Sequence, residues 1–553
     1  MSVALTTLPP YDADGCYGPD CASVGLDNAF EYVIVGAGAG GGPLAARLAR
    51  LGHRVLLLEA GGDAGDRLTY QIPAWHVLAS EDAAMRWDYF VQHYDDPTQA
   101  ARDDKLVRDG AGKAEGIWYP RGSGVGGSTM LNALIAITPH DSDWNNLATT
   151  LAAEDPSGSW SAASMRQYFM RAENNGYLPA GTIGHGFSGW MTVDVFLDRL
   201  VDYLMAAIDL KMLRVIIASV VQATQELGTL LPFDPLADVT RLLGYVGADL
   251  NSADPGRDAR QGAFRVPEQT LNGKRNGVRE FIVDTIAKGY PLTLKTHALA
   301  TRVLFDRSTA RPRAVGVEFL DGANLYAAAP SQSPAAGVTR QIRVSGEVVL
   351  AAGTFNTPQL LMLSGIGDKT ALAQQGIASV VDLPGVGANL QDRYEMSVIG
   401  EMTSVFGDAF TLIKDCSFDP TKTATQLALG DVCYDLWKQQ LGVYTINGVS
   451  VGIVKKSSVA SGDPDLFIFG LPGYFRGYYP GYSADAVASR RYFSWVVLKA
   501  HSRNHAGTVT LVSADPRARP NIHFRSFAQG GDADLQAVVD GVGFVRRIVA
   551  ATE

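Results

Sequence analysis

A glycine-rich turn between a short apolar strand and an apolar helix is the feature that most limits the folds open to this chain. Residues 31–35 are a β-branched run, residues 36–41 read GAGAGG, and residues 43–51 have apolar side chains at helical spacing. A second apolar strand, residues 54–58, ends at Glu59. This order predicts a βαβ unit, and therefore a parallel sheet with its ligand at the carboxyl ends of the strands.

The glycine spacing favours a dinucleotide as that ligand. Gly36, Gly38 and Gly41 place small residues where a turn is tight, where backbone approaches a pyrophosphate, and where the helix packs on the strand. The helix N-terminus can then face the phosphates. Glu59 ends the second strand, where a carboxylate accepts hydrogen bonds from ribose hydroxyls and disfavours a 2′-phosphate. The residues predict FAD or NAD rather than NADP.

Two further glycine-containing blocks follow at a distance. Residues 121–132 read RGSGVGGSTMLN, in which consecutive glycines and hydroxyl residues can present backbone N–H groups along an extended cofactor. A flexible glycine loop is the alternative, but it would not require Arg121 and Asn132 at the two ends. Residues 353–367, GTFNTPQLLMLSGIG, follow a predicted strand and start a helix with Pro358 in its first turn.

With these blocks the chain resembles the glucose-methanol-choline (GMC) oxidoreductase family of flavoproteins. The first turn with LLEAGG at residues 57–62, and the two later blocks, resemble the three main landmarks of that family. LPGVGANLQD at residues 383–392 and SADP at residues 513–516 also match it. The resemblance extends from about Phe30 to the last residue. It implies an α/β fold, with a Rossmann-like FAD-binding domain of mostly parallel sheet interleaved with an α+β substrate domain.

The resemblance implies FAD as the cofactor, with the first turn and Glu59 on its ADP half and the second block along the pyrophosphate and flavin. Ala300 stands where the family usually has a valine whose backbone contacts the adenine side. The expected FAD contacts are Gly36, Gly38, Gly41, Glu59, Ala60, Arg121, Gly126, Gly127, Ser128, Asn132 and Ala300.

The same resemblance divides the chain into six segments. We expect an N-terminal arm (1–29), a first FAD-domain part (30–190), a first substrate-domain part (191–265), a second FAD-domain part (266–395), a second substrate-domain part (396–530), and the start of an incomplete C-terminal FAD-domain segment (531–553).

The catalytic group is the main departure from the family. Family members carry a catalytic histidine beyond the region that resembles residues 534–549, and this sequence stops at Glu553. We therefore expect the family's C-terminal catalytic segment to be absent and leave the catalytic residue unassigned, with His501 and His505 as the remaining candidates. Ser123 replaces a commonly basic residue, and Arg393 stands where a histidine is frequent.

The expected activity is FAD-dependent oxidation of a primary or secondary alcohol, with hydride passing to the flavin and oxygen or another acceptor taking the electrons. A flavin-dependent lyase or decarboxylase of the same family, or an FAD-binding chain without activity, are the alternatives. An apolar segment could line a substrate entrance and favour lipophilic alcohols, or could simply be domain core. Its residues are Phe196, Leu197, Leu200, Val201, Leu204, Met205, Leu213, Ile216 and Ile217.

Charge and composition bear on the other partners. Lys and Arg number 47 against 57 Asp and Glu, a net charge of −10 that disfavours nucleic acid. We expect no transmembrane segment, because charged residues interrupt each apolar stretch, and no metal site, because Asp141 and Asp143 suit a helix start better. The four cysteines lack the spacing of a zinc ribbon, and we read Cys16 and Cys21 as free thiols rather than a local disulfide or half of a metal site. Free thiols favour a reducing compartment, the cytoplasm.

Overall fold

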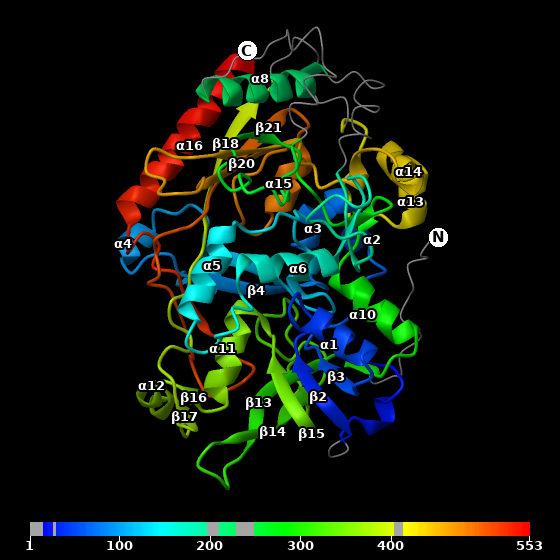
Figure 1. Cartoon of the computed structure of the whole chain (residues 1–553), viewed down its shortest axis with the longest axis vertical. Coiled ribbons are helices and arrows are strands. Elements are labelled where there is room, and N and C mark those ends of the chain that lie inside the picture. The colour runs from blue at the N-terminus through cyan, green and yellow to red at the C-terminus, as the bar shows by residue number, and fades with distance from the viewer. Residues whose placement is uncertain (1–14, 26–28, 196–209, 228–247, 403–412, 553) are drawn as a thin grey trace.

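The computed structural model describes residues 15–25, 29–195, 210–227, 248–402 and 413–552. A seven-stranded and a five-stranded sheet occupy opposite ends of the molecule, and helices α5 (Asp141–Thr150) and α6 (Ala162–Ala172) cross between them (Figure 1). The fold is α/β with a central, mostly parallel part in the larger sheet, as the sequence predicts.

The seven-stranded sheet contains the predicted βαβ unit. Strands β2 and β3 are parallel neighbours joined through helix α1 (Gly41–Arg50), and β12 and β15 continue the parallel order on either side. Antiparallel strands complete both edges. The sheet order is β1 (Cys16–Tyr17), β12 (Leu292–Lys295), β3 (Val55–Leu58), β2 (Phe30–Val35), β15 (Val338–Leu350), β14 (Arg313–Asp321) and β13 (Ala298–Asp306).

Small residues let helix α1 approach its neighbour closely. Its buried face packs against α10 (Val278–Ala287), and a Cβ at Gly42 would lie only 2.5 Å from Val278 Cγ1. Below the helix, β2 and β3 contribute side chains that are fully buried, Ile34 and Leu57 among them. Burial on both faces explains why these strands read as continuous apolar runs rather than alternating ones.

The five-stranded sheet is antiparallel and carries one helical layer. Its order is β18 (Tyr394–Glu401), β21 (Tyr492–Lys499), β20 (Leu466–Pro472), β19 (Val451–Lys455) and β9 (Gly262–Phe264). Trp495 and Val497 on one face share a hydrophobic core with Phe544 and Ile548 of helix α16 (Gly531–Thr552). Figure 1 shows α16 running along the edge of this region beside α8 (Leu210–Glu226).

Helix α16 lies within residues 531–553, which we predict to begin an FAD-domain segment, and that division of the chain stays a prediction. The apolar stripe of the helix is covered by the five-stranded sheet and α8, not by the seven-stranded sheet. In the apolar segment considered above, Leu213, Ile216 and Ile217 belong to α8 and pack in this same core. The other six, Phe196, Leu197, Leu200, Val201, Leu204 and Met205, lie outside the described residues.

Short elements connect the two large sheets. The strands are β4 (Arg86–Val91), β5 (Leu106–Arg108), β6 (Ala114–Gly122), β7 (Glu173–Asn175), β8 (Met191–Val193), β10 (Thr270–Leu271), β11 (Lys274–Arg275), β16 (Ile366–Gly367), β17 (Val381–Asp382), β22 (Thr508–Thr510) and β23 (Asn521–His523). The helices are α2 (Leu68–Gln71), α3 (His76–Ala79), α4 (Pro97–Ala100), α11 (Gly353–Leu363), α12 (Lys369–Gln374), α13 (Ala424–Ala428), α14 (Val432–Lys438) and α15 (Tyr482–Ala488). Single 3₁₀ turns are η1 (Cys21–Ser23), η2 (Pro73–Trp75), η3 (Gly127–Met130) and η4 (Val443–Thr445).

All four cysteines are paired, so the prediction of free thiols is wrong. Cys16 on the edge strand β1 bonds Cys21 in the following turn, with 5.8 Å between their Cα atoms. Cys416 bonds Cys433 at the start of α14, with 5.2 Å between Cα atoms. The expectation of a reducing compartment depended on free thiols and loses that support, because disulfides persist mainly in oxidising compartments.

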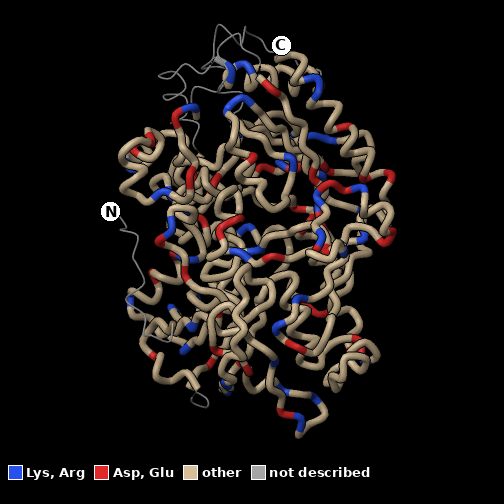
Figure 2. The backbone as a smooth tube through the Cα atoms, turned by 180° about the vertical axis from the view of Figure 1, so that it is seen from behind, with Lys and Arg blue, Asp and Glu red and all other residues tan. Residues whose placement is uncertain are grey.

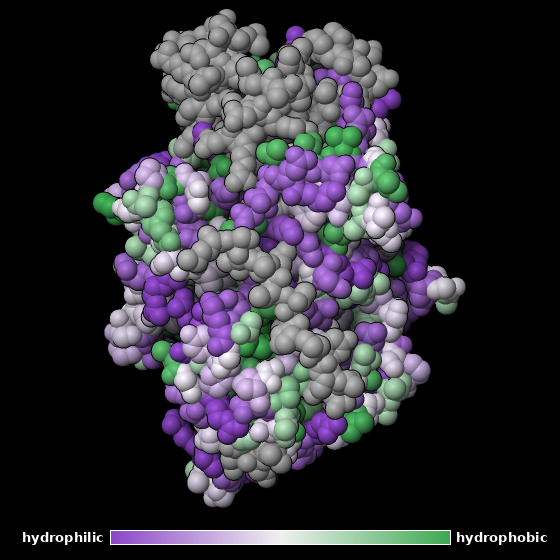
Figure 3. All heavy atoms as spheres, turned by 90° about the vertical axis from the view of Figure 1, so that its right-hand side faces the viewer, coloured by the Kyte–Doolittle hydropathy of each residue, from purple (hydrophilic) through white to green (hydrophobic). Residues whose placement is uncertain are grey.

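The described surface mixes charge and hydropathy. Figure 2 shows Lys and Arg interspersed with Asp and Glu along the backbone on the face it presents. Figure 3 shows hydrophobic residues in small groups between hydrophilic ones on the side it presents. Among the helices that the structure describes, none is both long enough and apolar enough to span a bilayer.

A buried cluster of charged side chains joins α16 to the five-stranded sheet, and its removal should lower the stability of the protein. Lys499 Nζ lies 3.7 Å from Asp534 Oδ1 and 3.5 Å from Asp465 Oδ2, and Arg503 Nη1 donates to Asp534 Oδ1 at 3.0 Å. Asp534 is fully buried. We expect Asp534→Ala to lower the free energy of unfolding by about 3 kcal/mol, because Lys499 and Arg503 lose a buried counter-charge.

Denaturant unfolding followed by tryptophan fluorescence measures this change. Asp532→Ala, on the same helical turn but exposed, is the matched control and should stay within about 0.5 kcal/mol of the parent protein. Equal unfolding midpoints for Asp534→Ala and Asp532→Ala would contradict the assigned role of the cluster.

Candidate functional site

The first two glycine blocks touch each other. A Cβ on Gly127 would lie 2.7 Å from the Cα of Gly38, and Gly127 has a φ of +56°. Gly126 N donates to Ala37 O at 2.9 Å, and Val125 N donates to Gly62 O at 3.0 Å. Backbone of the turn after β2 therefore packs directly on backbone of the turn after β6, and no side chain fits between them.

Around this contact lies a cavity of about 400 Å³, which we call the glycine cavity. It opens at the carboxyl ends of β2 and β3, next to the start of α1, where the βαβ prediction expects the ligand. Nine of the predicted FAD contacts line it: Gly36, Gly38, Glu59, Ala60, Arg121, Gly127, Ser128, Asn132 and Ala300.

Two predicted contacts do not line the cavity. A Cβ on Gly41 would meet Gly36 O at 2.1 Å, so Gly41 lies beneath the first turn, and Gly126 holds the second turn through its bond to Ala37. The third glycine-containing block, residues 353–367, was noted in the sequence without any predicted FAD contact. Its residues 353–356 also line the cavity.

Glu59 supplies the acidic side of the glycine cavity. Its Oε2 accepts from Ala37 N at 2.9 Å, and its Oε1 accepts from Gly61 N at 3.0 Å. Burial raises the pKa of Glu59, while these backbone hydrogen bonds oppose the rise. Each carboxylate oxygen can still accept a further hydrogen bond. A fixed acceptor at the end of β3, opposite glycine backbone, fits the ribose and pyrophosphate of a dinucleotide.

The far end of the glycine cavity is aromatic and cationic. The Arg121 guanidinium lies 4.4 Å from the ring centre of Tyr119 and 5.5 Å from that of Phe355. Tyr119 donates its hydroxyl proton to Asp392 Oδ2 at 3.1 Å. Arg275, which sequence reasoning missed, donates from Nη1 to Asn132 Oδ1 at 2.8 Å. Arg275 lies on a distant strand, and no local pattern marks it.

A second, larger cavity measures about 470 Å³ and is called the sheet cavity here. Asn132 lines the first cavity and the next residue, Ala133, lines the second. The wall is the face of the five-stranded sheet that points away from α16. Strand register places Leu498, Phe467 and Val454 opposite one another in one row of that face. Phe469 and Leu471 follow two and four residues further along β20, so the wall is mainly apolar.

Glu395 is the acidic member of that row. It pairs in register with Leu498 and lines the sheet cavity. Its carboxylate makes no hydrogen bond or ion pair within the described parts of the chain. Glu395 is exposed to solvent at this position. Partial desolvation by the protein around the carboxyl group, helped by nearby Asp392 and opposed by Arg393, raises the pKa of Glu395 to about 7. Tyr478 lines the same cavity, and desolvation by the surrounding protein, reinforced by the nearby carboxylate of Glu395, raises the pKa of its phenol.

The predicted histidine candidates have different positions. His501 lines the sheet cavity, and its Nε2 lies 3.1 Å from Asp143 Oδ1, a hydrogen bond that raises the pKa of His501. His505 is exposed and does not line the cavity. Asp143 also accepts from His140 N at 3.1 Å, as expected for the first turn of a helix.

A buried cluster that the sequence did not reveal supports the cavity from behind. His185 Nδ1 lies 3.1 Å from Glu173 Oε1, and its Nε2 lies 2.9 Å from Asp249 Oδ2, a carboxylate that lines the sheet cavity. Burial alone would lower the pKa of His185, but the two carboxylates raise it to about 9. The imidazole is therefore charged at neutral pH and holds Asp249 in place.

Comparison with known proteins agrees with this arrangement. Residues 30–395, more than half of the chain, match the GMC oxidoreductase family. The chain is 28% identical to an uncharacterized GMC-type oxidoreductase of Mycobacterium tuberculosis over 95% of its own length and 82% of that protein. It is also 28% identical to an oxygen-dependent choline dehydrogenase of Pseudomonas syringae, over 94% of its own length and 76% of that protein.

Solved structures show the same fold at lower identity. A formate oxidase aligns with a TM-score of 0.68 and 19% identity over 94% of this chain and 81% of that one. A fungal aryl-alcohol oxidase aligns with a TM-score of 0.62 and 19% identity over 95% and 83% of the two chains. With the family match and the paired glycine turns together, the protein is a member of the GMC oxidoreductase family, a flavoprotein whose cofactor is FAD.

Proposed function

We propose that this protein oxidises an alcohol by hydride transfer to FAD. The observation that carries the proposal is a glycine-lined cavity at the carboxyl ends of β2 and β3 together with a second cavity that has an apolar wall, the two being lined by the consecutive residues Asn132 and Ala133. FAD supplies the hydride acceptor. Relatives named as a choline dehydrogenase and an aryl-alcohol oxidase favour alcohol oxidation over the lyase, decarboxylase and inactive alternatives.

We assign the FAD contacts along the length of the glycine cavity. Glu59 accepts hydrogen bonds from the ribose, Gly38 and Gly127 allow the pyrophosphate to approach backbone, and Asn132 lies toward the flavin. Gly41 and Gly126 shape the two turns from outside. The seven-stranded sheet is the centre of the FAD-binding domain in this assignment, and the five-stranded sheet is the centre of the substrate domain.

We assign proton acceptance to Glu395. Hydride loss from the carbinol carbon leaves a carbonyl only if the hydroxyl proton also departs, and a carboxylate in the cavity can take it. Glu395 makes no competing hydrogen bond within the described residues, and its pKa of about 7 suits proton exchange near neutral pH. His501 is less suited, because it is already bound to Asp143.

The first prediction concerns cofactor retention. Glu59→Gln should weaken FAD binding by about 1–3 kcal/mol, because the ribose loses a charge-assisted acceptor and the amide N–H₂ faces the N–H groups of Ala37 and Gly61. Titration of apoprotein with FAD, followed by flavin fluorescence, measures the dissociation constant. Glu347→Gln, exposed on strand β15 of the same sheet, is the control. Equal FAD affinity in the two variants would refute the assignment.

A second prediction concerns the substrate. Lipophilic primary alcohols, long-chain or aromatic, should reduce the flavin faster than glucose, because the sheet cavity offers an apolar wall and burial contributes about 25 cal/mol per Å². Anaerobic stopped-flow absorbance at the flavin band compares the reduction rates. Faster reduction by glucose or choline than by the lipophilic alcohols would reject the proposed preference.

A third prediction concerns pH. Glu395 accepts a proton only when ionised, so flavin reduction should rise as pH passes through about 7 and level off above it. Glu395→Gln should slow reduction by a factor of about 10² to 10⁴ and remove this pH dependence. Infrared titration should show a carboxyl band that disappears near the same pH in the parent protein and is missing in Glu395→Gln.

Glu401→Gln is the matched control for this experiment. Glu401 is at the opposite end of strand β18 and pairs with Arg491 outside the sheet cavity. It should keep the parent rate and pH profile. Parent-like reduction and pH dependence in Glu395→Gln would assign the proton to another group.

A further inference from the structure

A third cavity lies directly behind the sheet cavity and has no part in the site described so far. It measures about 80 Å³ and is called the rear chamber here. His76, Val77, Leu471 and Phe475 line both cavities, so a single layer of side chains stands between them. The other lining residues are mostly apolar and include Met212, Ile413, Phe418, Val443, Ile446 and Ala486, while Arg490, Asn447, Ser450 and Ser489 supply its polar part.

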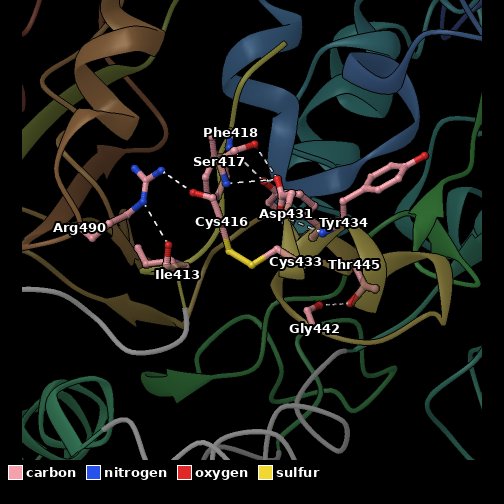
Figure 4. Close-up of a disulfide and its surroundings, with 11 residues drawn as sticks. Ile413, Cys416, Ser417, Phe418, Asp431, Cys433, Tyr434, Gly442, Thr445 and Arg490 are labelled. Atoms are coloured by element: carbon pink, nitrogen blue, oxygen red, sulfur yellow. Dashed lines mark hydrogen bonds between the residues drawn. A yellow bond between two sulfur atoms is a disulfide. The ribbon is translucent and has the colours of Figure 1, made fainter. Parts of the chain in front are cut away.

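Hydrogen bonds and a disulfide hold the loop on one side of the rear chamber. Figure 4 shows Arg490 reaching across to the loop before α13, with its Nε donating to Ile413 O at 3.1 Å and its Nη2 donating to Cys416 O at 2.8 Å. The same loop is tied to α14 by the Cys416–Cys433 disulfide. Protein interiors contain few voids, and a void persists only where its surroundings cannot relax into it.

A second clamp acts on the loop beside the disulfide. Asp431 Oδ2 accepts from Ser417 Oγ at 2.6 Å and from the Tyr444 hydroxyl at 2.9 Å. Phe418 N donates to the Tyr444 oxygen at 3.0 Å. The carboxylate of Asp431 therefore bonds to the loop, and Asp431 does not line the rear chamber.

The layer between the two cavities carries no charge at neutral pH. His76 Nε2 donates to Asn447 O at 3.0 Å, and burial, reinforced by Arg275, lowers the pKa of His76 to about 4. Val77, Leu471 and Phe475 are apolar. A hydrocarbon chain passing between these side chains would desolvate no ion, whereas a polyhydroxylated chain would lose hydrogen bonds to water there.

We propose that the rear chamber binds the tail of an unbranched aliphatic alcohol whose hydroxyl end lies in the sheet cavity near Glu395. The proposal rests on the proposed function for the oxidation of that alcohol, but the binding of the tail can be measured without any reaction. The substrate class is thus a medium- or long-chain primary alcohol rather than a sugar or a short amino alcohol.

A chain-length series of 1-alkanols tests the proposal on the FAD-bound protein. Isothermal titration calorimetry gives the affinity of each alkanol, and anaerobic flavin reduction gives its rate. We expect affinity to rise about fourfold for each methylene that enters the chamber, the equivalent of about 0.8 kcal/mol per methylene, and then to level off. No rise with chain length in the parent protein would overturn the proposal.

Two substitutions in the chamber should shift the length dependence in opposite directions. Ala486→Phe fills the chamber, so long alkanols should bind more than tenfold more weakly while short alkanols keep their affinity. Val443→Ala enlarges the chamber, so the plateau should move to longer chains. Ala484→Phe, on the exposed side of the same helix α15, is the control for Ala486→Phe and should match the parent protein.

The outcomes separate this inference from the proposed function. If no alkanol reduces the flavin but binding still depends on chain length and responds to Ala486→Phe and Val443→Ala, alcohol oxidation is refuted and tail binding in the rear chamber is supported. If alkanols reduce the flavin but the dependence of affinity on chain length is the same in the parent and both variants, alcohol oxidation is supported and tail binding in the rear chamber is refuted.

Discussion

The backbone contact between Gly38 and Gly127 is the constraint on which the rest of the site depends. The 2.7 Å that separates a Gly127 Cβ position from the Gly38 Cα leaves no room for a side chain. Because the contact joins the turn after β2 to the turn after β6, it brings Arg121 and Asn132 to the cavity that Glu59 lines. Each turn alone is a local motif, and their contact makes one elongated site from both.

This dependence explains which parts of the site could be read from sequence. The strand, glycine turn and helix around Gly36 are encoded within about thirty residues, so local periodicity sufficed to predict them. Eight of the nine predicted FAD contacts that line one cavity fall in or beside a local motif, and the ninth, Ala300, was expected only from the family resemblance. Glu395 was missed because its position depends on the pairing of β18 with β21, a register that no local pattern specifies.

Other features that the sequence did not reveal have the same physical origin. The Cys416–Cys433 bond joins a loop to a helix across intervening residues whose path is set by tertiary packing, so cysteine spacing gave no signal for it. Helix α16 has an apolar stripe that either sheet could cover, and only the buried Lys499–Asp534 pair and the Trp495 core assign it to the five-stranded sheet. His185 reads as an isolated histidine until folding places Glu173 and Asp249 on its two nitrogens.

The apolar wall of the sheet cavity links substrate preference to proton chemistry. Phe467, Leu498 and Val454 form the apolar row that continues from Glu395 across the sheet, and apolar protein beside the carboxyl group disfavours its ionised form and so raises its pKa. The same wall favours burial of hydrocarbon. A more polar wall would weaken the binding of an aliphatic chain and, at the same time, return Glu395 toward the acidity of an ordinary carboxylic acid. The same packing of apolar side chains therefore favours a lipophilic alcohol and keeps Glu395 able to accept a proton near neutral pH.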